Sequence, residues 1–429
     1  MPDNASTPWG LGAGLRYGLL GLPLAFCALP LYVFMPNFYA TQWGVSLAAL
    51  GTLLLALRLF DAVLDPAIGH WVDRLAAGPF ARLLAALVSA GVLLALAFAA
   101  LFHPQVAAAD ALAWAGVSLA LTYLGYSLLT VAHQSWGARL GGDAVQRSRI
   151  VVWREGLGLV GVVLASIVPA LWGVTPTAIV MAVALALGLW ALSGAPRPQA
   201  RVGAAAPLPV HLESRQLLAP WKDPAFVRLL VVFALNGIAT AVPATLVLFF
   251  IQDRVQSLPS MQGVFLGLYF MCAALSMPLW LRVVARLALA RSWLLGMVLS
   301  VLAFAGAAAV GAGDAFLYGV VCVLSGLALG SDLAVPAALL AGITARDARR
   351  HGVYFGWWNF ASKLNLALAA GLTLPLLGWL GYAPGARDAH SLQALTLVYC
   401  LVPCVLKLLA AAALHYFFIQ MRNGESYAT

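Results

Sequence analysis

Long runs of apolar residues, separated by short polar intervals, make up most of the chain. A helix needs about 20 apolar residues to cross a bilayer, and only helices or closed barrels satisfy their backbone polar groups in lipid. The runs do not alternate between apolar and polar positions, so we predict helices. Twelve are expected, at 15–36, 45–70, 80–102, 110–138, 149–172, 175–194, 225–251, 261–284, 291–312, 316–341, 353–380 and 392–419. The predicted fold class is an all-α membrane protein.

The longest polar interval lies near the middle of the chain and is rich in Pro, Ala and Arg. It predicts a bundle of six helices over 1–194, a linker over 195–224 and a second bundle of six helices over 225–429. Lys and Arg gather after the even-numbered helices, whereas the other intervals hold only about two cations, Arg254 and Arg387. Cytoplasmic loops carry the excess of Lys and Arg, so we expect the linker and both termini in the cytoplasm.

The composition narrows the classes of protein to consider. The 429 residues are 63% hydrophobic and only 9% charged, whereas about 25% of an ordinary soluble chain is charged. A soluble enzyme, a disordered tail protein and a disulfide-rich scaffold are therefore excluded. The net charge of +9 is spread over many intervals, so nucleic acid is not an expected partner.

The second predicted helix carries charges that lipid would not tolerate. Arg58, Asp61 and Asp65 are three and four residues apart, which places them on one face of a helix. Placing an ionisable side chain at the centre of a bilayer costs about 3 kcal/mol or more. Such a side chain therefore implies an ion-pair partner, a water-filled cavity or a functional role. Two neighbouring carboxylates can bind Na⁺ through their oxygens or hold a proton, while Arg58 offsets their charge when the cation leaves. The alternative is a static clamp between Arg58 and an acid.

The C-terminal half has no matching pair of acids. It contributes Lys363, within a predicted helix, and Asp332, just before a Val-Pro step. A buried Lys with a remote acid is either a paired structural ion or a group that exchanges partners during transport. We group Arg58, Lys363 and Asp332 as the expected charge network.

Three segments resemble one family. Residues 58–69, RLFDAVLDPAIG, resemble the helix II signature of the glycoside-pentoside-hexuronide:cation symporters, the melibiose-permease-like branch of the major facilitator superfamily. Residues 126–154 look like helices IV and V of that family, and residues 352–363 are similar to its helix XI motif. The residues Gly69, Asp73 and Arg74 match the start of the superfamily's short loop signature, whose usual role is a conformational latch. The resemblance implies two six-helix bundles that rock around a site near the midplane.

The resemblance also implies roles for single residues. Asp61 and Asp65 fall on the family's helix II cation ligands, Lys363 falls on its helix XI lysine, and Arg154 falls on an arginine near the bound glycoside. The sequence departs from the melibiose type at Pro23 and at Thr130, where that type carries acids that serve the sugar. These departures argue against a galactoside, and we keep Thr130 as an expected oxygen ligand near the cation.

The remaining candidates for binding solute are aromatic and amide side chains. Besides Arg154, they are Tyr126, Gln134, Trp136, Trp358 and Asn359. Aromatic rings stack on sugars but also accommodate apolar tails. The Gly-x-Pro of the first helix also looks like that of animal relatives that carry lysophospholipids.

We therefore predict a cation-coupled secondary transporter in a bacterial inner membrane, which moves a glycoside or related polyol by alternating access. One alternative is transport of an amphiphile such as a lysolipid, or of a siderophore-sized molecule. Another is a sensor that does not transport. The sequence offers no nucleophile–base pair, metal cluster or phosphate loop, so we do not expect an enzyme. The expected partners are a small-molecule substrate and the lipid bilayer, with no cofactor beyond Na⁺ or H⁺, and the chain is expected to act as a monomer.

Overall fold

The computed structural model describes residues 9–198, 214–347, 349–383 and 385–420. These residues form helices joined by short turns, and no strand occurs among them. They fall into two compact units. The N-terminal unit comprises Met1–Pro220 and Ala341–Phe360, and the C-terminal unit comprises Trp221–Leu340 and Ala361–Thr429.

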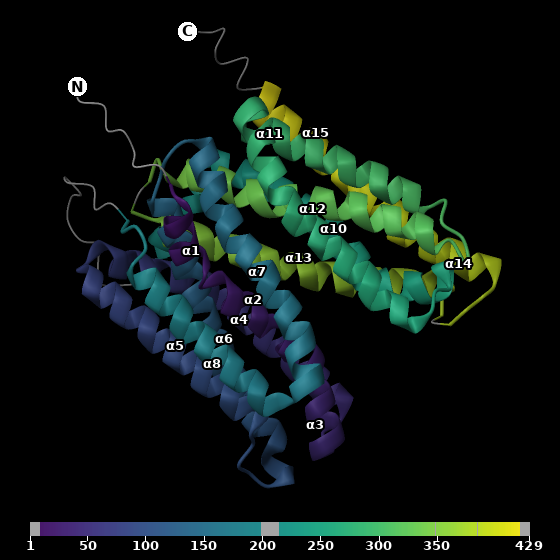
Figure 1. Ribbon diagram of the computed structural model, residues 1–429, viewed down its shortest axis with the longest axis horizontal. Coiled ribbons are helices and arrows are strands. Elements are labelled where there is room, and N and C mark those ends of the chain that lie inside the picture. Colours follow the sequence, from purple (N-terminus) through teal and green to yellow (C-terminus); the bar gives the residue numbers. More distant parts are fainter. Residues whose placement is uncertain (1–8, 199–213, 348, 384, 421–429) are drawn as a thin grey trace. The chain divides into compact units, whose positions relative to one another are not determined.

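The N-terminal unit begins with a span built from four consecutive segments, α1 (Leu11–Gly18), α2 (Gly21–Leu29), the π-helical η1 (Pro30–Phe34) and α3 (Met35–Trp43). The helices that follow are α4 (Leu47–Ala77), α5 (Phe80–Phe102), α6 (Ala111–Arg139), α7 (Ala144–Trp172) and α8 (Val174–Ser193), with the short η2 (Ala108–Asp110) before α6. Helix α5 packs against both α6 and α8, α4 packs against α6, and α2 packs against α7 (Figure 1).

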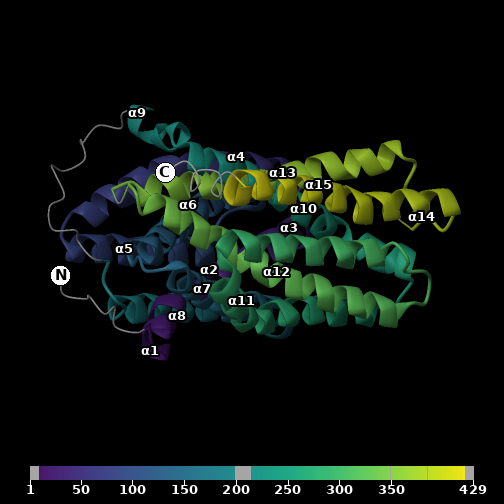
Figure 2. The same ribbon diagram turned by 90° about the horizontal axis from the view of Figure 1, so that it is seen from above.

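The C-terminal unit is built from helices that contain several π-helical turns. Its elements are α10 (Pro224–Phe249), η4 (Phe250–Val255), α11 (Pro259–Ala307), α12 (Ala315–Thr344), α13 (His351–Trp379), α14 (Ala389–Thr396), η5 (Leu397–Leu401), α15 (Val402–Leu414) and η6 (His415–Gln420). Helix α15 packs against α10 and α11, and it continues the line of α14 (Figure 2). The end of α12 and the first ten residues of α13 belong to the N-terminal unit.

Part of the predicted linker, residues 199–213, lies outside the described residues. The rest of its length includes α9 (Ser214–Leu217) and η3 (Ala219–Lys222). Residues 1–8 and 421–429 also lie outside them, so the cytoplasmic location of both termini stays a prediction.

The prediction of twelve membrane-crossing helices in an all-α fold is confirmed. Ten helices in the described part of the chain are long and apolar enough to cross a membrane. One of them, α11, is 49 residues long and contains two of the predicted helices. Helix α4, with 31 residues, is a further apolar helix, interrupted by charged side chains. With α11 counted twice and α4 added, the number is twelve.

One predicted polar interval, around residues 284–291, does not form a loop. The chain changes direction there at a single residue, Ala288, whose φ of 63° and ψ of 170° interrupt α11. A side chain with Cβ rarely adopts a positive φ, because Cβ crowds the following carbonyl. The two helices therefore meet directly, and Arg282, Arg286 and Arg291 lie on helical turns.

The outer surfaces of both units carry many exposed apolar side chains. Trp190 is 75% exposed, and Phe316 and Trp379 are each 87% exposed. Such exposure would be costly in water but is what a surface in contact with lipid requires.

Polar residues mark the starts of three helices. The side chains of Ser46, Asp143 and Asp223 each accept a hydrogen bond from a backbone N–H of the first turn.

Candidate functional site

The acidic pair predicted on the second span lies on α4, in the N-terminal unit. Asp61 is 6% exposed and Asp65 is fully buried, whereas Arg58 is half-buried. Residues four apart on a helix have Cβ atoms about 5–6 Å from each other, so the two carboxyl groups share one face of α4. Pro66 follows directly and removes one backbone donor from the same turn. The structure therefore places both acids inside the protein.

A residue that the sequence analysis missed contacts this pair. The Ser127 hydroxyl of α6 donates a hydrogen bond to Asp61 Oδ1 at 2.7 Å, and both side chains are buried. A hydrogen bond to an ionised group contributes about 1.5–3 kcal/mol. Ser127 thus links the acidic face of α4 to α6.

Ser127 could have been predicted from the sequence, because it lies on a stripe of polar residues along one face of α6. Tyr123, Ser127, Thr130 and Gln134 follow at spacings of four, three and four residues, which is one face of an α-helix. Thr130, a predicted cation ligand, is half-buried on this stripe, one turn from Ser127. The stripe supplies oxygen atoms, which are the ligands that hard cations prefer.

Two of the predicted solute-binding residues meet further along the stripe. The Asn359 side-chain amide of α13 donates to Gln134 Oε1 at 3.0 Å. Both residues belong to the N-terminal unit, because α13 begins there. An amide pair of this kind offers further donors and acceptors to a polyhydroxylated ligand.

The other predicted solute-binding residues have different surroundings. The Trp136 ring lies in the core against Phe80, and its N–H donates to the Pro196 carbonyl at 3.0 Å. The Arg154 guanidinium forms an ion pair with its neighbour Glu155 at 2.6 Å and is 9% exposed. Two more aromatic candidates are Tyr126, half-buried on α6, and Trp358, buried on α13.

The predicted latch residue Asp73 lies near the C-terminal end of α4, about three turns after Asp61. Its Oδ1 accepts from the Gly352 backbone N–H at 2.6 Å, and its Oδ2 accepts from that of Val353 at 3.0 Å. Arg139, at the end of α6, forms an ion pair with the same carboxylate at 2.5 Å. Asp73 therefore caps the N-terminal turn of α13, where unpaired N–H groups favour negative charge.

Two glycines allow this capping. A Cβ on Gly69 would collide with the backbone carbonyl of Gly352, and a Cβ on Gly352 would collide with the carbonyl of Gly69 and with Asp73. The backbones of α4 and α13 thus cross at a distance that only glycine permits. Arg74, the third residue of the predicted latch, is half-buried in the last turn of α4.

The C-terminal unit contains a charged cluster of a different kind. Lys407 of α15, which is 2% exposed, donates to Asp332 Oδ2 at 2.6 Å and to Asn236 Oδ1 at 2.9 Å. The Trp293 indole N–H donates to the other carboxylate oxygen of Asp332 at 2.9 Å. Sequence reasoning placed Asp332 in a network with Lys363 and did not single out Lys407. Lys363 itself is half-buried in the same unit, on α13.

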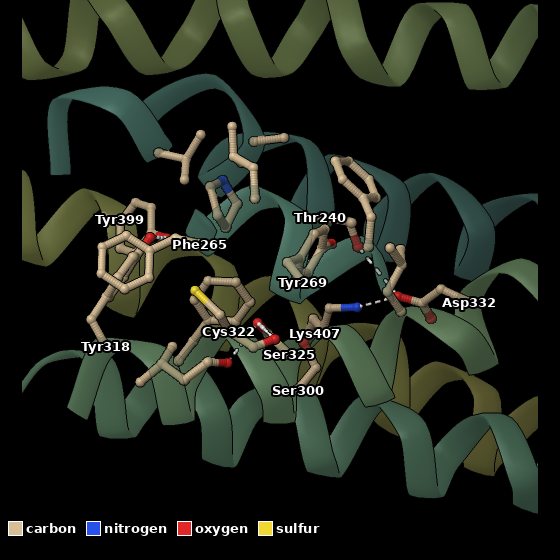
Figure 3. A pocket seen from close by; sticks show the side chains of 18 residues that line it. Thr240, Phe265, Tyr269, Ser300, Tyr318, Cys322, Ser325, Asp332, Tyr399 and Lys407 are labelled. Carbon is tan, nitrogen blue, oxygen red and sulfur yellow. Dashed lines mark hydrogen bonds and ion pairs between the residues drawn. The ribbon is translucent and has the colours of Figure 1, made fainter. Parts of the chain in front are cut away.

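A cavity of about 150 Å³ lies beside this cluster, within the C-terminal unit (Figure 3). Asp332 and Lys407 line it at one end, together with Thr240 and Tyr269, and the remaining walls are largely aromatic and aliphatic.

No group of three or more His, Cys, Asp or Glu side chains that could hold a metal ion occurs in the part of the chain that the structure describes.

Comparison with known proteins agrees with the fold. Residues 16–421 match the profile of the family described as MFS/sugar transport protein. Two curated proteins of Escherichia coli K12 are similar over shorter stretches. YagG, named as a glycoside/cation symporter, is 29% identical over 150 residues, which are 34% of this chain and 32% of YagG. The inner membrane symporter YicJ is 25% identical over 138 residues, which are 32% of this chain and 29% of YicJ. The chain thus spans about a third of the length of these relatives.

Several solved structures share the fold. A bacterial homologue of the iron transporter ferroportin, in its outward-facing state, superposes with a TM-score of 0.69 at 17% identity, covering 94% of this chain and 98% of that one. The transporter FucP gives a TM-score of 0.64 at 13% identity over 94% of this chain and 99% of its own. The human organic anion transporter MFSD10 gives 0.65 at 17% identity over 94% and 100%. The match along most of its length shows that the chain is a multi-pass membrane protein of the MFS/sugar transport protein family, in agreement with its resemblance to the glycoside-pentoside-hexuronide:cation symporters.

Proposed function

We propose that this protein is a cation-coupled secondary transporter that moves a glycoside or related polyol across the inner membrane by alternating access. The observation that carries the proposal is the pair of buried carboxylates on α4, Asp61 and Asp65, within a chain of a sugar transport family. The curated relatives, named as a glycoside/cation symporter and an inner membrane symporter, support the same reading.

The acidic pair would bind the coupling ion. Two carboxylates on one face of a helix repel each other in a medium of low dielectric constant, and a cation between them relieves that repulsion. Na⁺ would be held by carboxylate oxygens together with the hydroxyl oxygens of Ser127 and Thr130. A proton would instead be held by one carboxyl group and shared with its neighbour. Both ions neutralise the same face of α4.

Neutralisation would then be coupled to the conformational change. Closing a cavity over an ionised pair removes water from both charges, which is expensive, whereas closing it over a neutralised pair is not. Solute and cation each shift the same equilibrium by the difference in their affinities for the two states. The Gln134–Asn359 amide pair is the contact that we assign to solute hydroxyls.

The Asp73 latch would hold one state of the transport cycle. Its carboxylate is bound to the first turn of α13 and to Arg139, so moving α13 away from α4 breaks charge-assisted hydrogen bonds. Each such bond contributes about 1.5–3 kcal/mol, which is the scale of a conformational equilibrium. The latch would therefore set the resting population of that state.

The test is solute transport by purified protein reconstituted in vesicles. A panel of glycosides, polyols, lysolipids and siderophores is first screened by thermal shift with and without Na⁺ from pH 5 to 8, and the stabilising solutes are then tested for counterflow. We expect a glycoside or polyol to exchange across the membrane and to accumulate when an inward Na⁺ or H⁺ gradient is applied. Stabilisation by a ligand without counterflow would favour a sensor, and accumulation of a lysolipid alone would favour the amphiphile.

A further inference from the structure

The cavity of the C-terminal unit has a polar end and an apolar body. It is bounded by α10, by both parts of α11, by α12 and by the η5–α15 segment, so it lies within one bundle (Figure 3). A volume of about 150 Å³ corresponds to roughly ten to fifteen water-sized positions. That space suits a ligand of about ten non-hydrogen atoms.

Aromatic rings form the apolar body. Phe265 packs edge-on against Tyr318 with ring centroids 4.9 Å apart, and Phe304 packs against Tyr399 at 5.9 Å. The Tyr318 and Tyr399 hydroxyls are hydrogen-bonded to each other at 3.0 Å, and both residues line the cavity. Aromatic walls of this kind favour a flat ring, which gains edge-to-face or offset-stacked contacts.

The charged groups lie at the opposite end, and Ser300 and Ser325 also line the cavity. Asp332 and Lys407 are ion-paired at 2.6 Å, and the hydroxyls of Thr240 and Tyr269 lie beside them (Figure 3). The ion pair is neutral as a whole, and it presents an acceptor and a donor side by side. A ligand hydroxyl can accept from Lys407 and donate to Asp332, whereas a charged group would meet repulsion from one member of the pair.

We propose that this cavity is a binding site for a small neutral ring compound with a single hydroxyl, of the phenol or naphthol class. The ring lies among Phe265, Phe304 and the two hydrogen-bonded tyrosines, and its hydroxyl bonds to Asp332 and Lys407. A sugar would place some of its hydroxyls against the aromatic rings, where each buried group without a partner costs about 1–3 kcal/mol. The site is therefore distinct from the proposed glycoside site and does not depend on it.

The test measures binding of 2-naphthol to the purified full chain by equilibrium dialysis against the same detergent. We expect one saturable site per chain. Naphthoate and naphthylmethylammonium, which add a negative or a positive charge, are expected to bind at least tenfold more weakly. Methylnaphthalene, which lacks the hydroxyl, is expected to bind more weakly as well. Equal affinity for all four compounds, or binding of 2-naphthol that does not saturate, would overturn the proposal.

Neighbouring valines on α12 provide a matched pair of variants. Val321 is 4% exposed and lines the cavity, whereas Val320 is 38% exposed on the outer surface. Val321→Phe fills the cavity and should reduce 2-naphthol binding at least tenfold, while Val320→Phe should leave it unchanged. Ser325→Leu fills the same cavity from the next turn and replaces Val321→Phe if that variant does not fold. Unchanged binding in a folded filled variant, or equal losses in both valine variants, would contradict the site.

Discussion

The acids on α4 and the acid on α12 are arranged differently. In the N-terminal unit, Asp61 and Asp65 are two acids on the face of α4 that also carries Arg58, and Asp61 accepts a hydrogen bond from the Ser127 hydroxyl. In the C-terminal unit, Asp332 is bound to a cation from the same unit, Lys407, at 2.6 Å. The first arrangement brings two carboxyl groups together on one helix, and the second pairs a single carboxylate with one ammonium group.

Under the proposed function, this difference separates a site for an external ion from a structural ion pair. A like-charged pair is stabilised when a cation enters, so its free energy depends on the conditions outside the protein. An acid and a base in contact within one unit neutralise each other, and removing one of them leaves a buried charge uncompensated. Substitutions in the two regions should therefore have opposite consequences for stability and for transport.

The largest effect on stability is expected from Lys407→Met. This change leaves Asp332 buried without its cation, which should lower the free energy of unfolding by about 3–5 kcal/mol. The measurement is denaturant unfolding in detergent, with Lys222→Met, at an exposed position, as the control. Adding Asp332→Leu to Lys407→Met should recover most of the loss. A single variant as stable as the unmodified protein would contradict the structural role of the pair.

A smaller effect is expected from Ser127→Ala, which removes the hydrogen bond to Asp61. Under proton coupling, the ionised state loses about 1.5–3 kcal/mol, so the pH of half-maximal uptake should rise by about one to two units. Under Na⁺ coupling, loss of an oxygen ligand should weaken Na⁺ affinity instead. Ser166→Ala, on an exposed face of α7, serves as the control. Unaltered ion dependence would show that the α6 stripe has no part in coupling.

The smallest effect is expected from Thr240→Val. The Thr240 hydroxyl lies 3.4 Å from Asp332 Oδ2, at the edge of hydrogen-bonding range, and it also donates to the Asn236 carbonyl at 2.9 Å. Removing it should reduce the free energy of unfolding by less than about 1 kcal/mol. A loss as large as that of Lys407→Met would mean that Thr240, rather than Lys407, is the main support of Asp332.

The helices were predictable from the sequence because each apolar run has the length that a bilayer imposes. The predicted span at 80–102 coincides with α5 (Phe80–Phe102), and most other ends agree within a few residues. The break in α11 was not predictable. Three arginines between residues 282 and 291 suggest a polar loop, but a single positive φ at Ala288 suffices to turn the chain.

The site was predictable in part. The spacing of Asp61 and Asp65 placed both on one face of α4, and burial agrees with that reading. Lys407, like Lys363, is a lone cation in an apolar run, so the sequence pattern does not distinguish the two lysines. Which of them meets Asp332 depends on how α12 and α15 pack, and spacing along the chain does not contain that information.

The most direct test of the account compares Asp61→Asn and Asp65→Asn with the unmodified protein in vesicles that hold an ion gradient. Asp110→Asn, at an exposed position before α6, is the matched control. Either membrane variant should fold and express normally but fail to accumulate solute, while the control accumulates it fully. Full accumulation of solute by Asp61→Asn or Asp65→Asn would contradict the claim that the coupling ion binds these two carboxylates.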